Sequence, residues 1–366
     1  MLPLQTNTKF RKIIDSLFQQ AYQKGASDLH LAAGSSPILR INGELVEISQ
    51  YDKLSAQQIQ AMIFSILNKP QQEEFLNRRE LDISYDLMGF CRFRVNLHYE
   101  KESVGMVARV VANNIPSMKE LGFPEVVYKL VRGRQGLILV TGPTGSGKST
   151  SLASMINLIN TERRAHIVTL EDPIEFLYQS KLSLIRQRQY HSDFLSFPEG
   201  LKHVLRQDPD VIMVGEMRDL ETIAAAITVA ETGHLVLATL HTSNAADTID
   251  RIVDVFPPHQ QPQIRIQLSM ELRGVISQQL LPRKNGGRLA TREIMLNTPA
   301  ISNLIRENKI SQINTIIQTS ANVGMQTMDQ DIRRLYGNNE ITKETALSYM
   351  LNPASLTEYK NPKTEE

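Results

Sequence analysis

Hydrophobic residues in the first part of the chain follow helical and strand-like spacings in turn. Between residues 10 and 21 they recur at helical spacing, which predicts a helix that Gly25 ends. Residues 28–48 predict short strands around Asn42-Gly43, a dipeptide typical of a two-residue hairpin turn. A second helix is predicted over residues 59–67, because apolar positions return to helical spacing before Pro70.

Residues 91–98 alternate strictly between apolar and polar, as in a strand with one buried face. The predicted polar face carries Arg92, Arg94, Asn96 and His98. Together these elements predict an N-terminal α+β domain over residues 1–112. A linker is predicted over residues 113–122, because it opens with the turn-forming run Asn113-Asn114-Ile115-Pro116.

The pattern then changes to continuous apolar runs separated by helical segments. The runs occupy residues 137–140, 166–170, 211–214 and 235–239. Strands that are buried on both faces read this way, so we predict a parallel sheet in a doubly wound α/β core over residues 123–297. Residues 298–366 are predicted to be mostly helical, with a frayed, charged tail at 360–366.

Composition limits the possible functions. The chain has 366 residues, which is long for one ordinary domain, and its formal net charge of +1 offers no global attraction to nucleic acid. Its one cysteine, Cys91, excludes an internal disulfide framework. No apolar run reaches the ~18 residues of a membrane span, so we expect a cytoplasmic protein without a transmembrane segment.

One motif predicts the ligand. It comprises Gly142, Pro143, Thr144, Gly145, Ser146, Gly147, Lys148, Ser149 and Thr150. This is the P-loop pattern G-x-x-x-x-G-K-[ST], and it follows a predicted strand and precedes a predicted helix, as that motif requires. A chance glycine-rich turn is the alternative. We expect the loop to bind the phosphates of ATP, Lys148 to reach them, and Ser149 to hold Mg²⁺.

Carboxylates at predicted strand ends are candidates for the chemistry. Residues 171–175 include Glu171 and Glu175 directly after one strand, and Glu216 follows another. We assign Glu216 the general-base role. Gly215 precedes it where many P-loop proteins have an aspartate, so help in binding Mg²⁺ must come from other residues, for which Glu171 is the candidate. The alternative for Glu171 is a helix cap or a solvated loop.

Two histidines bracket the strand predicted over residues 235–239. About seven strand residues span over ~20 Å, so His234 and His241 cannot bind one metal together. We therefore consider one of them as a sensor of the γ-phosphate and favour His234. A structural histidine is the alternative.

Arginines of the N-terminal domain are the second source of positive charge. Arg92 and Arg94 share a strand face, and Arg109 lies on the next predicted strand. Such a face is often only solvated. The other possibility is that they act as arginine fingers, either within the chain or on a neighbouring subunit.

These residues together resemble the secretion-type (traffic) ATPase superfamily and, within it, the PilT-like retraction ATPases of type IV pili. The resemblance covers nearly the whole chain. The segments that carry it are Gly25-Ala26-Ser27-Asp28-Leu29-His30-Leu31, residues 91–96, the P-loop, residues 171–175, Gln207-Asp208-Pro209-Asp210, Gly215-Glu216 and residues 232–242.

The resemblance implies a PAS-like N-terminal domain and a RecA-like ATPase domain, assembled as a homo-hexamer. It implies that Lys148 binds phosphate, that Glu216 is the catalytic base, and that Glu175 and His234 belong to the site. Arg94 and Arg109 fall where the family places its arginine contacts. The implied activity is ATP-driven pilus retraction at the cytoplasmic face of the inner membrane, through a membrane platform protein.

Residues 300–307 are similar to the motif Ala-Ile-Arg-Asn-Leu-Ile-Arg-Glu of retraction ATPases, with Ser302 in place of the first arginine. An accessory retraction paralogue or a secretion ATPase of the same superfamily therefore remains an alternative. A RecA-like nucleic-acid translocase is a more distant one, which the near-neutral charge disfavours.

Overall fold

The computed structural model describes residues 4–41, 43–87, 91–111 and 114–357. The chain forms two compact units. One consists of Met1–Asn114 with Glu175–Leu177, and the other of Ile115–Ile174 with Tyr178–Glu366. Each unit has its own sheet and hydrophobic core.

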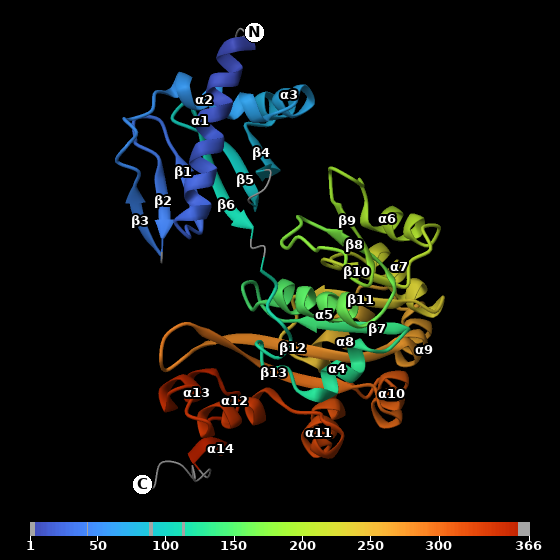
Figure 1. Ribbon diagram of the computed structural model, residues 1–366. Helices are drawn as coiled ribbons and strands as arrows, with labels where there is room; N and C mark the ends of the chain where they lie inside the picture. The colour runs from blue at the N-terminus through green and yellow to red at the C-terminus, as the bar shows by residue number, and fades with distance from the viewer. Residues whose placement is uncertain (1–3, 42, 88–90, 112–113, 358–366) are drawn as a thin grey trace. The chain divides into compact units, whose positions relative to one another are not determined.

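The first unit is a six-stranded antiparallel sheet in the order β3-β2-β1-β6-β5-β4, with helices packed against it (Figure 1). The strands are β1 (Asp28–Leu31), β2 (Ile38–Ile41), β3 (Glu44–Glu47), β4 (Glu80–Leu87), β5 (Cys91–Glu100) and β6 (Ser103–Val111). The helices are α1 (Leu4–Gln23), α2 (Ala56–Ile66) and α3 (Lys69–Arg78). Phe18 of α1 packs on Phe93 of β5 with ring centroids 4.5 Å apart, in the centre of this core.

The structure confirms the helices predicted over 10–21 and 59–67 and the alternation along β5. Cys91, Phe93, Val95 and Leu97 are buried, whereas the arginines between them are not. Helix α3 was not predicted, because a proline after a helical pattern is typical of a helix end. Here Pro70 lies in the first turn of α3, where its missing N–H costs nothing, and Asn68 caps that helix. The hairpin residue Asn42 lies outside the described residues, but β2 and β3 pair from Ile41 and Glu44 outward.

The second unit is a seven-stranded sheet in the order β13-β12-β7-β11-β10-β8-β9, in which only the β12–β13 pair is antiparallel. Its strands are β7 (Gly136–Thr141), β8 (His166–Glu171), β9 (Leu184–Gln189), β10 (Val211–Val214), β11 (Leu235–Leu240), β12 (Leu272–Pro282) and β13 (Arg288–Leu296). Its helices are α4 (Glu125–Val131), α5 (Lys148–Glu162), α6 (Phe197–Val204), α7 (Leu220–Glu231), α8 (Ala245–Asp254), α9 (Gln261–Glu271), α10 (Pro299–Arg306), α11 (Ile313–Thr319), α12 (Met328–Gly337), α13 (Lys343–Tyr349) and α14 (Ala354–Thr357).

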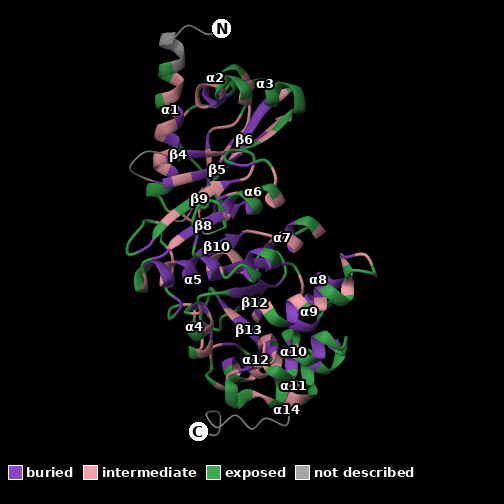
Figure 2. Cartoon of the chain, turned by 90° about the vertical axis from the view of Figure 1, so that its right-hand side faces the viewer, coloured by how far each residue is buried: buried purple, intermediate pink, exposed green. Residues whose placement is uncertain are grey.

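Alternate residues of the central strands pack into different cores on the two faces of this sheet. Ile138 and Val140 of β7 pack with α4 and α5, whereas Leu137 and Leu139 pack with helices from α7 to α10. Buried residues accordingly fill the strands between the helical layers (Figure 2). The predicted doubly wound α/β fold is confirmed, because both faces of the parallel strands are covered.

All four predicted parallel strands are present, and residues 298–357 are mostly helical as predicted. The charged tail at 360–366 lies outside the described residues. The strands β9 and β12 were not predicted. The run Leu-Ile-Arg-Gln-Arg-Gln of β9 is polar, and β12 is interrupted by Gly274, Ser277 and Gln278, so neither reads as a buried strand. Among the described residues, no helix is both long and apolar enough to cross a bilayer.

Candidate nucleotide-binding site

The P-loop connects β7 to α5 and depends on three glycines in the left-handed region. The φ angles are 141° at Gly142, 79° at Gly145 and 87° at Gly147. A Cβ on Gly142 would collide with the carbonyl oxygen of Gln278 and would lie 2.7 Å from Ser146 Oγ. Only glycine therefore allows the loop to fold this tightly against β12.

Lys148, the first residue of α5, folds back over the loop. Its Nζ donates hydrogen bonds to the carbonyl oxygens of Gly142 at 2.8 Å and Pro143 at 3.1 Å. The ammonium group is thus held where the loop surrounds an anion, and the N-terminus of this 15-residue helix adds its partial positive charge. A second feature fits the same ligand. The buried Ser146 Oγ has no hydrogen-bond partner within the part of the chain that the structure describes.

The residues present also fit a magnesium ion held together with phosphate. Ser149 is in the first turn of α5, next to Lys148. Within the described ranges, no group of three or more His, Cys, Asp or Glu residues could hold a metal by itself. Glu171 is buried at the end of β8, where its Oε1 accepts hydrogen bonds from Thr169 Oγ1 at 2.7 Å and Gln187 Nε2 at 3.0 Å. Glu171 thus belongs to a buried hydrogen-bond network with Thr169 and Gln187. Its contact with Mg²⁺ stays a prediction.

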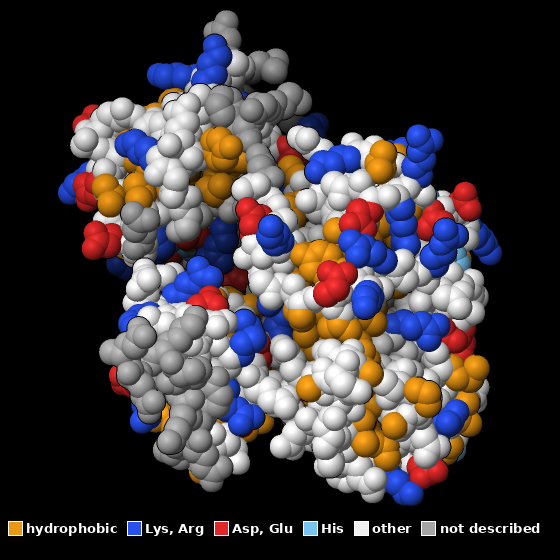
Figure 3. Space-filling model, turned by 60° about the horizontal axis from the view of Figure 1, so that its bottom comes forward, with side chains coloured by type: hydrophobic (Ala, Val, Ile, Leu, Met, Phe, Trp, Pro, Cys, Tyr) orange, Lys and Arg blue, Asp and Glu red, His pale blue; other side chains and the backbone are white. Residues whose placement is uncertain are grey.

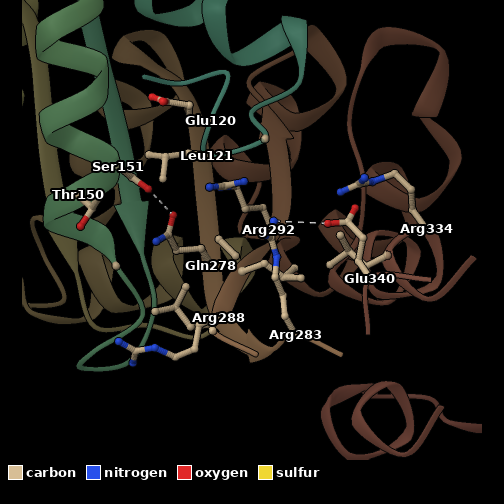
Figure 4. A pocket seen from close by; sticks show the side chains of 17 residues that line it. Glu120, Leu121, Thr150, Ser151, Gln278, Arg283, Arg288, Arg292, Arg334 and Glu340 are labelled. Atoms are coloured by element: carbon tan, nitrogen blue, oxygen red, sulfur yellow. Dashed lines mark hydrogen bonds and ion pairs between the residues drawn. The ribbon is translucent and has the colours of Figure 1, made fainter. Parts of the chain in front are cut away.

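A cavity of about 570 Å³ adjoins the P-loop, which is within the size range of nucleotide and drug sites. Thr150 and Ser151 of α5 line one side of it, and Arg292 and Arg334 line the other, with Leu121 nearby (Figure 4). Arginines predominate on its far side, where Arg283 pairs with Glu340 at 3.6 Å.

Arg292 is the most unusual side chain of the cavity. Its guanidinium lies 3.8 Å from the centroid of the Phe123 ring, and burial lowers the pKa of Arg292 to about 10. It remains charged at neutral pH. Arg292 could not be predicted from the sequence, because a single arginine carries no signal of burial.

Glu216 occupies the edge of the sheet that carries the P-loop. Its Oε2 accepts a hydrogen bond from Arg218 at 2.8 Å, and its Oε1 lies 3.1 Å from His241 Nε2. Burial raises the pKa of Glu216, but the hydrogen bond from Arg218, together with the charges of Arg218 and His241, outweighs it and leaves the pKa below its ordinary value. A half-buried carboxylate is therefore held ionised, with a histidine beside it.

Strand register places His241 close to the P-loop. β11 pairs with β7 in parallel so that Leu240 lies opposite Thr141, and the next residues are His241 and Gly142. On the other side, Thr239 Oγ1 donates to the carbonyl oxygen of Gly215 at 2.5 Å, which ties β11 to the turn that carries Glu216.

His234 lies at the opposite edge of the same sheet. Its carbonyl oxygen accepts from Gly136 N, at the start of β7, and its Nδ1 is 3.0 Å from Thr232 Oγ1. The six residues of β7 separate this position from the P-loop by about 20 Å. His241 and not His234 is therefore the histidine beside Glu216, and the sensor role of His234 stays a prediction.

The remaining predicted residues are placed as follows. Glu175 is exposed in the segment between β8 and β9. Arg94 and Arg109 lie directly opposite each other on β5 and β6 of the first unit. Arg109 Nε donates to the buried Asp28 at 2.8 Å, and Arg92 pairs with Asp86 at 3.4 Å. Their predicted roles at the nucleotide stay predictions.

Comparison with known proteins fits this geometry. The sequence profile described as Type II/IV secretion system protein matches residues 4–345. This chain belongs to that family. It is 47% identical to the type IV pilus retraction ATPase PilT of Pseudomonas aeruginosa over 333 residues, which cover 91% of this chain and 96% of PilT. It is 40% identical to the type IV pilus ATPase PilU of the same organism, covering 92% of this chain and 88% of PilU.

Solved structures agree with the sequence relatives. The crystal structure of the pilus retraction motor PilT with bound ADP matches with a TM-score of 0.89 at 44% identity, over 94% of this chain and 99% of that one. The Legionella pneumophila ATPase DotB matches with a TM-score of 0.76 at 27% identity, over 92% of this chain and 94% of DotB. The predicted membership of the PilT-like secretion ATPases is confirmed, and with it the enzyme class, an ATPase.

Proposed function

We propose that this chain is the ATP-hydrolysing motor of type IV pilus retraction, working as a homo-hexameric ring. The ring acts on a pilus platform protein at the cytoplasmic face of the inner membrane. The similarity to PilT over nine-tenths of the chain supports this proposal. The observation that carries it is the convergence of Lys148, Glu216 and His241 on one edge of the sheet of the second unit.

The proposed chemistry follows from these contacts. Lys148 Nζ exchanges the carbonyl oxygens of Gly142 and Pro143 for the β- and γ-phosphates of ATP, while the amides of the loop and of α5 donate to the same anion. Glu216, kept ionised by Arg218, accepts a proton from the attacking water. His241 orients this carboxylate through its contact with Oε1.

The metal and the arginines complete the site. Mg²⁺ bound at Ser149 would neutralise charge on the phosphate oxygens, which lowers the barrier for phosphoryl transfer. Arg94 and Arg109 would supply further positive charge from the first unit of the same or a neighbouring chain, and Glu175 would join the site from its exposed segment. Closure of the ring around ATP and its opening after hydrolysis would then produce movement.

The test separates binding from hydrolysis. We expect Lys148→Ala to weaken ATP binding about a hundredfold, since a charged contact to phosphate is lost. We expect Glu216→Gln to bind ATP normally and to lower steady-state phosphate release about a hundredfold or more. Undiminished phosphate release by Glu216→Gln would exclude the general-base role.

The biological role needs a cellular readout. Deletion of the gene is expected to leave excess surface pili without twitching motility, whereas a loss of pili would indicate extension or secretion instead.

One observation favours an accessory retraction paralogue as the second candidate. Ser302 Oγ donates to the carbonyl oxygen of Ser269 at 2.8 Å, so it ties α10 to α9. The arginine that is typical of the retraction motif would place a positive charge at this position, where Ser302 is neutral. If Ser302→Arg leaves retraction unchanged in the complemented deletion strain, the accessory role loses its support.

Charge does not favour the nucleic-acid translocase. On the face shown in Figure 3, Lys and Arg side chains are interspersed with Asp and Glu. A nucleic-acid site would need a continuous basic stripe.

A further inference from the structure

Gln278 of β12 contacts the P-loop and the start of α5 through the nitrogen and the oxygen of its side-chain amide. Its Nε2 donates to the carbonyl oxygen of Ser146 at 2.6 Å. Its Oε1 accepts from Ser151 Oγ at 2.7 Å, as Figure 4 shows. Only 1% of the residue is exposed. A buried amide with both ends bonded is held in one orientation, and here it joins the loop to the first turn of α5.

The chemistry of the partners determines which way this amide faces. A backbone carbonyl can only accept, so the NH₂ group of Gln278 must point to Ser146, and the oxygen is then left for the Ser151 hydroxyl. The backbone of Gln278 contacts the loop as well, since its carbonyl oxygen occupies the space that a side chain on Gly142 would need. One residue therefore braces the beginning, the end and the following helix of the P-loop.

The bond to Ser146 also sets the direction of an amide that faces the ligand. In a trans peptide the C=O and the following N–H point in opposite directions. Because Ser146 C=O points at Gln278, the N–H of Gly147 points away from β12, into the concave side of the loop. Gly147 has a φ of 87°, and because glycine adopts positive and negative φ about equally readily, the bond from Gln278 helps to fix the orientation of this peptide.

We propose that Gln278 is a positioning residue for nucleotide binding, which aims the Gly147 amide at a phosphate of ATP or ADP before the nucleotide arrives. This inference rests on the proposed function, in which the P-loop binds a nucleotide. Gln278 acts through Ser146 and Ser151 and takes no part in the chemical step. Its loss therefore weakens the binding of ATP and ADP and leaves the turnover of bound ATP unchanged.

The test uses the full-length protein and the variants Gln278→Met and Ser151→Ala. Methionine has a similar length and makes neither hydrogen bond. We expect it to raise the Kd for ADP and the KM for ATP about tenfold, with kcat within about twofold. Ser151→Ala keeps the bond to Ser146, so we expect about a twofold to threefold rise. The double variant should bind no more weakly than Gln278→Met alone, because both changes remove one network.

Asn297 provides a matched control. Its Nδ2 donates to the carbonyl oxygens of Ser269 and Leu272, both at 2.8 Å, so it is a side-chain amide that anchors backbone carbonyls outside the P-loop. Asn297→Leu should lower the thermal unfolding midpoint without changing the Kd for ADP. If Gln278→Met behaves in the same way, Gln278 is only structural and the inference is wrong.

Three further outcomes are decisive. If Gln278→Met does not fold, an unchanged Kd in Ser151→Ala overturns the inference, and a raised Kd supports it. If the unaltered protein binds neither ATP nor ADP, the proposed function fails and the inference fails with it. An unchanged Kd in Gln278→Met, with binding intact in the unaltered protein, overturns the inference alone.

Discussion

The two edges of the seven-stranded sheet carry similar residues and have different chemistry. At the carboxyl ends of the strands, Glu216 contacts His241 at 3.1 Å beside the P-loop. At the amino ends, Asp210 accepts a hydrogen bond from His166 N at 2.7 Å, and His234 contacts Thr232. Both edges therefore combine an acid with histidines near strand ends.

What separates them is the direction of the strands. In a parallel sheet all carboxyl ends meet at one edge, where the loops can surround a ligand and helices begin. The amino edge receives chain returning from helices, and its polar residues satisfy backbone groups, as Asp210 does. An acid and a histidine near a strand are thus a candidate site only at the correct end.

Substitutions of His241 and His234 test most directly the difference between the carboxyl and amino edges of the sheet. We expect His241→Ala to lower kcat for ATP about tenfold or more, because Glu216 loses the group that orients it. His234→Ala should leave kcat within about twofold. The measurement is steady-state phosphate release at saturating ATP. The reverse order of effects would support His234 as the sensor and would require it to act on a neighbouring subunit.

A weaker effect is expected from the arginine that keeps Glu216 ionised. The pKa of Glu216 lies below the ordinary value of a glutamate. Activity should therefore fall only when the pH drops below this lowered pKa. Arg218→Gln removes the hydrogen bond and charge, leaves the effect of burial, and should raise the pKa of Glu216. The acidic limb of a kcat/KM profile between about pH 4 and about pH 8 should therefore move to higher pH.

The control for the shift of the acidic limb is an arginine at the amino edge of the sheet. Arg206 is exposed before the amino end of β10, and Arg206→Gln should not move the acidic limb. An identical profile for Arg218→Gln and the unaltered protein would contradict the electrostatic role of Arg218.

The smallest effect is expected at the amino edge, on stability alone. Asp210→Ala should lower the free energy of unfolding by about 1 kcal/mol, since the acceptor for His166 N is lost. Asp210→Asn keeps an acceptor oxygen and should lose less. Urea unfolding measures this difference, and KM for ATP should stay within about twofold for both variants. A rise in KM would show that the amino edge is coupled to the nucleotide.

Much of the fold could be predicted from periodicity. The four apolar runs became β7, β8, β10 and β11, because strands covered on both faces leave a continuous signal. β9 and β12 were not predicted, because polar residues interrupt their apolar pattern. These polar residues contact neighbouring loops and strands. Gln278, for example, is polar and buried because it bonds the P-loop, and a pattern search treats it as exposed.

The candidate site was predictable only in part. The P-loop and Glu216 have local signatures, a glycine pattern and an acid after an apolar strand, so the sequence located them. Gln278 and Arg292 have none, because each is defined by a partner far along the chain or by burial. Which of the two histidines lies beside Glu216 could not be predicted without the register of β7 and β11.

The sequence by itself determined the ligand class, the family and the strand that leads into the P-loop, since these depend on residues adjacent in the chain. Only the tertiary structure decided which histidine lies beside Glu216 and which residue braces the loop. The physical reason is that hydrogen bonds depend on distances of about 3 Å. Such distances between β7, β10, β11 and β12 arise from strand order and register, which local patterns do not contain.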